Sequence, residues 1–103
     1  MKRTICEYIF WNVIPTIRRE IAKSMVHDFG LNQKDAANKL GITPAAVSLY
    51  ISEKRGIIQI ADKSIISEIK ISAENIIKDK SKSLIGETCR ICKIIRNKKL
   101  FPF

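Results

Sequence analysis

Several features that mark large classes of protein are scarce in this chain. It has 4 glycines and 3 prolines among 103 residues, which excludes collagen-like and Pro/Gly-rich low-complexity chains. No apolar stretch approaches the ~20 residues that a membrane-spanning helix needs. No small-residue cleavage site follows the basic start Met1-Lys2-Arg3. We therefore expect an intracellular, cytoplasmic protein without a membrane partner.

Signatures of catalysis are scarce as well. There is one histidine, and we find no glycine-rich phosphate loop, no Walker motif and no pair of carboxylates on one helical face. The Cys-x-x-Cys pair lacks the βαβ context of a thiol oxidoreductase. We expect that the protein is not an enzyme.

Positive charge is what the chain has in excess. Lys and Arg number 19 against 10 Asp and Glu, which gives a net charge of +9 and a pI near 9.8. The excess is largest in residues 86–103, which hold five bases and one acid. Such a balance favours a polyanionic partner, although solubility alone would also explain it.

Apolar spacing and capping residues predict helices throughout. We expect a short helix over 4–13 and a second over 15–29, or one helix kinked at Pro15. Asn32 can cap a helix over 33–40 that stops at Gly41. Thr43 can cap the next helix over 44–52, with proline at its first position.

The second half of the chain predicts a long helix and a shorter one. Isoleucines recur at helical spacing over 61–83, with charged residues on the other side, and Gly86 then breaks the pattern. A last helix covers 87–97. We therefore expect an all-α fold of about five to six helices, with a helix-turn-helix domain and a long C-terminal amphipathic helix. The helix-turn-helix domain and its N-terminal helix would span 1–56, and a C-terminal helical extension 57–103.

The most informative stretch has the form of a helix-turn-helix. It reads Leu31-Asn-Gln-Lys-Asp-Ala-Ala-Asn-Lys-Leu-Gly-Ile-Thr-Pro-Ala-Ala-Val-Ser-Leu-Tyr-Ile-Ser-Glu-Lys-Arg55. Gly41 suits a tight turn with positive φ, and small alanines let two helices pack closely. This stretch resembles the Cro/lambda-repressor-like helix-turn-helix family, also called the XRE family. The wider chain is similar to small archaeal regulators of that family with a C-terminal Cys-x-x-Cys.

The resemblance implies that the helix over 44–52 enters the DNA major groove. The family positions that face bases are here Thr43, Pro44, Ala45, Ser48 and Leu49. Gln33 matches a phosphate-contacting position, Lys54 and Arg55 match a basic end that touches the backbone, and Lys34 is a further phosphate candidate.

Many members of the family have Gln, Asn or Arg where this chain has Pro44, Ala45 and Leu49. Those residues lack bidentate donors. Direct readout would then rest on Thr43, Ser48 and methyl contacts from Ala45 and Ala46 to thymine. Selectivity would depend more on DNA shape and dimer spacing.

Three cysteines, Cys6, Cys89 and Cys92, leave several interpretations open. They could bind zinc or an iron–sulfur cluster, act as a redox switch, or pack as apolar thiols. His27 or a second copy of the Cys pair could complete a metal site. Arg90 and Lys93 would lower the pKa values of the neighbouring thiols.

These observations predict a sequence-specific regulator of transcription that binds double-stranded DNA as a homodimer. A metal or cluster at the cysteines would modulate it. The helix over 61–83, with or without 4–13, is the candidate dimer contact, and burial in the monomer core is the other interpretation. The alternative function is an antitoxin-like interaction module that also binds DNA.

Overall fold

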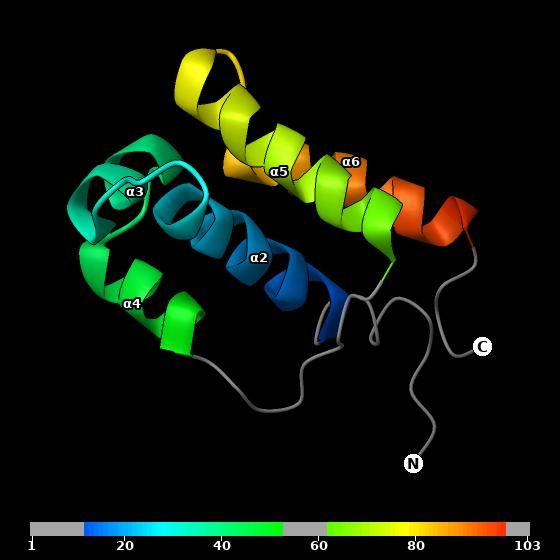
Figure 1. Cartoon of the computed structure of the whole chain (residues 1–103), viewed down its shortest axis with the longest axis horizontal. Coiled ribbons are helices and arrows are strands. Elements are labelled where there is room, and N and C mark those ends of the chain that lie inside the picture. The colour runs from blue at the N-terminus through cyan, green and yellow to red at the C-terminus, as the bar shows by residue number, and fades with distance from the viewer. Residues whose placement is uncertain (1–11, 53–61, 99–103) are drawn as a thin grey trace.

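The computed structural model describes residues 12–52 and 62–98, and within these ranges the chain is helical without strands. The helices, drawn in Figure 1, are α2 (Ile14–His27), α3 (Gln33–Leu40), α4 (Pro44–Ser52), α5 (Lys63–Lys78) and α6 (Leu84–Asn97). The all-α prediction is confirmed. The helix expected over 4–13 falls almost wholly outside the described residues.

Helix α2 is the central element of the fold. Figure 1 shows it between the α3–α4 pair and the α5–α6 hairpin, and it packs against all four of these helices. Ile17, Ile21 and Met25, at the spacing expected from the sequence, are fully buried. Thr16 and Ala22 are buried beside them. Helix α2 thus forms one core with both halves of the chain.

The single long helix predicted over 61–83 is not confirmed, because α5 ends at Lys78. The Asp79 carboxylate accepts hydrogen bonds from the Ser81 N–H at 2.9 Å and the Ser81 hydroxyl at 2.7 Å. The Lys82 N–H donates to the Asp79 carbonyl, which closes a turn. Such a local carboxylate turn competes with helix propagation.

Gly86 does not break a helix, contrary to the prediction. It lies in the first turn of α6, and its N–H donates to the Ser83 hydroxyl at 3.0 Å. Ser83 is therefore the N-cap that starts α6, three residues earlier than the sequence pattern indicates.

The apolar stripe of α5 is part of the monomer core. Ile65, Ile69, Ala73 and Ile76 are each at most 4 % exposed, and α5 packs against α2 and α6. These four side chains therefore belong to the monomer core, whereas Ile66 and Ile71 of the same helix are exposed, so the expected dimer contact through this helix stays a prediction. None of the helices in the described ranges is long and apolar enough to cross a membrane.

Candidate nucleic-acid interface

Backbone chemistry fixes both ends of α3. The Asn32 side chain accepts a hydrogen bond from the Asp35 N–H at 2.7 Å and caps the start of the helix. Gly41 ends it with φ 72°, and the Ile42 N–H donates to the Ala37 carbonyl at 3.0 Å. This is the left-handed termination that glycine allows without strain. The turn between the two helices of the motif therefore has a defined shape.

Helix α4 begins directly after this turn. The Thr43 hydroxyl oxygen accepts a hydrogen bond from the Ala46 N–H at 3.1 Å, and the Val47 N–H donates to the Thr43 carbonyl. Pro44 occupies the first helical position, where its missing N–H costs nothing. Thr43 therefore has a structural role in addition to the base contact that the resemblance implies.

The motif packs through small and branched side chains. Ala36, Ala37 and Leu40 of α3 are buried, as is Val47 of α4. Tyr50 and Ile51 pack more loosely against the same core. Because α4 contacts chiefly α2 and α3, it lies at the edge of the molecule with one face in solvent (Figure 1).

The solvent face of α4 contains the base-reading candidates. Pro44, Ala45, Ser48 and Ser52 are exposed, and Leu49 is 67 % exposed. Ala46, which was expected to contact thymine, is only half-exposed and borders the core side. No charged residue occurs within Pro44–Ser52, so the whole face is neutral.

The phosphate candidates have different surroundings. Gln33 and Lys34 are exposed in the first turn of α3, where a helix N-terminus also favours an anion. Thr43, which is a base-reading candidate, is also exposed and precedes the first residue of α4. Lys54 and Arg55 lie outside the described residues, as does Cys6, so their predicted roles stay predictions.

The two C-terminal cysteines lie one turn apart on α6. Cys89 is exposed and Cys92 is half-buried against the core. Burial raises the pKa of the Cys92 thiol, outweighing the opposite effect of the Arg96 charge. The expected lowering of this thiol's pKa by Arg90 and Lys93 is therefore wrong. The Arg90 guanidinium is bonded to Glu68, Ser72 and Glu87.

The described residues do not by themselves form a metal centre. They contain no group of three or more His, Cys, Asp or Glu side chains that could hold a metal ion. His27 lines a separate pocket of about 260 Å³ between α2 and α5. The cysteine pair therefore supplies two thiols, and zinc or a cluster would need Cys6 or a second copy of the chain.

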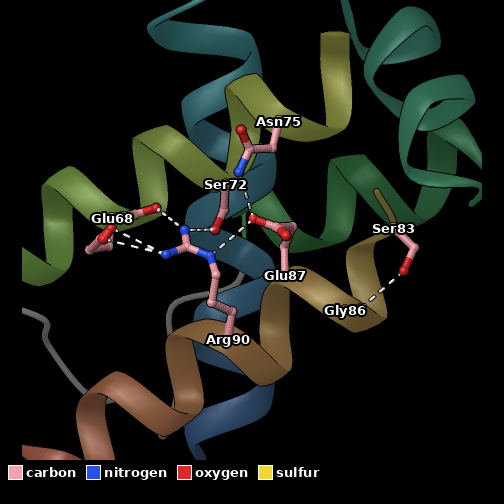
Figure 2. Close-up of polar contacts among 7 residues, drawn as sticks. All are labelled: Glu68, Ser72, Asn75, Ser83, Gly86, Glu87 and Arg90. Carbon is pink, nitrogen blue, oxygen red and sulfur yellow. Dashed lines mark hydrogen bonds and ion pairs between the residues drawn. The ribbon is translucent and has the colours of Figure 1, made fainter. Parts of the chain in front are cut away.

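A polar network that was not predicted from the sequence joins α5 to α6. The Arg90 guanidinium donates to both Glu68 carboxylate oxygens at 3.1 and 3.3 Å, to the Glu68 carbonyl and to the Ser72 hydroxyl at 2.7 Å. Arg90 Nε also donates to Glu87 at 3.2 Å, and the Asn75 amide donates to the same carboxylate oxygen at 3.1 Å. Figure 2 shows Arg90 as the centre of this network.

The network favours the ionised form of Glu87, whose side chain is only 5 % exposed. Burial alone raises the pKa of this carboxyl, but hydrogen bonds from Asn75, Ser72 and Arg90 together hold the pKa below its usual value. The Glu87-x-x-Arg90 spacing was visible in the sequence. Its connection to Glu68 and Ser72 depends on how the two helices pair.

Comparisons with models of protein families, with curated proteins and with solved structures gave no match to this chain.

Proposed function

We propose that this protein is a sequence-specific regulator of transcription that binds double-stranded DNA through α3 and α4. The observation that carries the proposal is the neutral, solvent-facing side of α4, held at the edge of the molecule by the capped turn between Gly41 and Thr43. An exposed second helix of this kind can fit the major groove.

Charge supports the same partner. The chain carries a net charge of +9, and exposed Lys34 lies in the first turn of α3, within the motif. Cations placed around a neutral helix would contact phosphates while that helix faces base edges. Binding to phosphates of this kind weakens steeply as salt rises.

We further propose that two copies bind one site. A single α4 of nine residues reaches only a few base pairs with its exposed side chains. Two copies on half-sites separated by roughly one helical turn, about 34 Å, would read a longer palindromic sequence. Ile65, Ile69, Ala73 and Ile76 of α5 are buried, so a contact between copies would use other side chains.

Selection from a randomised DNA pool tests this function. The full chain is incubated with duplexes carrying a random central segment, and bound sequences are amplified and read. We expect a recurring two-fold sequence, bound at least about a thousandfold more tightly than random duplex. Sedimentation on the selected duplex should give two chains per site.

Failure to enrich any sequence would contradict the proposal. The antitoxin-like alternative is favoured if the chain binds all DNA sequences equally and a second protein sediments with it when it is purified from cells. One chain per selected duplex would contradict the homodimer while leaving DNA recognition in place.

A further inference from the structure

We propose that α4 reads its DNA site mainly through contacts with thymine methyl groups, made by Ala45 and Leu49, so that the target is a thymine-containing duplex. This inference rests on the proposed function and names the class of sequence that the same face would take.

Leu49 is the one large apolar residue within the described range 12–52 that is exposed. It is 67 % exposed, whereas Ile17, Ile21, Met25 and Val47 are fully buried. Leu49 follows Ala45 by four residues, so the two side chains lie on one face, one turn apart. Together with Pro44 they present an apolar strip on a helix with no charged residue.

This strip offers few groups for hydrogen-bonded base readout. Recognition of guanine or adenine edges commonly uses bidentate Arg, Lys, Asn or Gln, and Pro44–Ser52 contains none of these. The Ser52 hydroxyl already donates to the Ser48 carbonyl at 2.9 Å, and the Thr43 hydroxyl oxygen caps the helix. Among base pairs, only those with thymine present an apolar group in the major groove of unmodified DNA, namely the C5 methyl.

Spacing and charge are consistent with this occupant. Residues four apart on a helix are separated by roughly 6 Å along its axis, which is close to two base-pair steps of about 3.4 Å. Exposed Lys34 and the net charge of +9 favour a polyanionic partner such as DNA.

The test removes only the methyl groups. The full chain first selects its site from a randomised pool, and the selected duplex is then made with thymine or with uracil at each thymine position. Base pairing is kept, and affinities are compared by fluorescence anisotropy at one salt concentration. We expect a loss of about fourfold for each methyl contact, based on ~0.8 kcal/mol for each buried methylene-sized group.

Two matched variants assign the effect to α4. In Leu49→Ala the discrimination between thymine and uracil should shrink by about fourfold, since one apolar contact is gone. Alanine is a good helix former, so α4 should stay folded. Ile85→Ala is the control, because Ile85 on α6 is 68 % exposed, nearly as much as Leu49, and lies outside the motif. It should keep the full discrimination.

Equal affinity for the thymine and uracil duplexes would overturn the inference while leaving the proposed function intact. So would equal discrimination in wild type and Leu49→Ala, since the effect would then come from DNA shape. If Leu49→Ala separates a dimer formed without DNA, the face is a contact between copies and the inference is wrong. A chain that selects no sequence fails earlier, and the proposed function fails with it.

Discussion

The α3–α4 pair and the α5–α6 hairpin are stabilised in different ways. Both pack against α2, and each consists of two helices joined by a short connection. In α3–α4 the polar contacts are caps and turn bonds, made by Asn32, Gly41 and Thr43 to nearby backbone. In α5–α6, side chains up to 22 residues apart form one network around Arg90.

This difference separates binding from stability. The α3–α4 pair packs through buried apolar side chains and is capped by bonds to nearby backbone, so the outward side chains of α4 are available for recognition. The hairpin has a cap and a turn as well, but charged side chains also join its two helices. We therefore expect substitutions on the face of α4 to change DNA affinity with little effect on folding, and substitutions in the hairpin network to do the reverse.

The largest expected effect on stability comes from Arg90→Met. It removes the charged donor that bonds to both Glu87 and Ser72, which are buried, and we expect the free energy of unfolding to fall by about 2 kcal/mol. Solvent screens the charge of the Arg90 side chain, which is 34 % exposed, and this limits the loss of stability. Urea denaturation measures it. Lys93→Met is the control, since Lys93 is exposed on the same helix. Equal stability of the two variants would show that the network does not hold the hairpin.

Gly41→Ala tests the turn of the α3–α4 pair. At φ 72° an alanine is strained, although nothing lies within 4 Å of its added Cβ. We expect a loss of about 1–2 kcal/mol in unfolding free energy. Asn tolerates this backbone conformation better, so Gly41→Asn should lose less. If both variants were as stable as wild type, the left-handed turn would not constrain the motif.

Thr43→Ala and Ser48→Ala separate capping from recognition. Loss of the Thr43 cap should lower stability by about 1 kcal/mol and also weaken specific binding. Ser48 is exposed on α4, and Ser48→Ala should weaken specific over random DNA while leaving the urea midpoint nearly unchanged. If Ser48→Ala lowered stability and left DNA affinity unchanged, the face of α4 would serve folding and not DNA binding, which contradicts the comparison.

Acid should loosen the hairpin through Glu87. Because the folded-state pKa of this carboxyl is below its usual value of 4.5, its ionised form stabilises the fold above that pH. This contribution is lost as pH falls below 4.5 through the folded-state pKa. Urea midpoints between pH 6 and pH 3 should fall less steeply in Glu87→Gln than in wild type. Parallel pH curves for the two proteins would contradict the role of Glu87.

The smallest expected effect on folding is that of the cysteine pair. Cys89 is exposed, so Cys89→Ser should leave the unfolding free energy within about 0.5 kcal/mol of wild type.

If the pair binds zinc or an iron–sulfur cluster, metal analysis of protein purified without oxygen should find metal in wild type and none in Cys89→Ser/Cys92→Ser. Equal metal content in both proteins would exclude these cysteines as ligands.

Local signals in the sequence were enough to predict the α3–α4 pair. Asn32, Gly41, Thr43 and Pro44 each act on backbone within a few residues, and the bounds Gln33–Leu40 and Pro44–Ser52 agree with the prediction. The positions that the resemblance assigns to base reading are exposed, which the apolar pattern of the motif already indicated. Their binding role stays a prediction.

The hairpin was harder to predict because its determinants are not local. Helical periodicity continues from Ile76 to Leu84, so the turn made by Asp79 and Ser81 was hidden in a polar stretch. The partners of Arg90 come from the preceding helix and are brought together only when α5 and α6 pair. Packing against both α2 and α6 buries Ile65, Ile69, Ala73 and Ile76 of α5, and the sequence alone left these residues open to a dimer contact.

The most direct test of the central claim is an NMR titration of the ¹⁵N-labelled full chain with its selected duplex. At 11.7 kDa the backbone amides are readily assigned and followed. We expect the largest shift changes at the start of α3 and along Thr43–Ser52, with small changes in α5 and α6. Changes concentrated on the α5–α6 hairpin, or none in α4, would contradict the assignment of DNA binding to the helix-turn-helix.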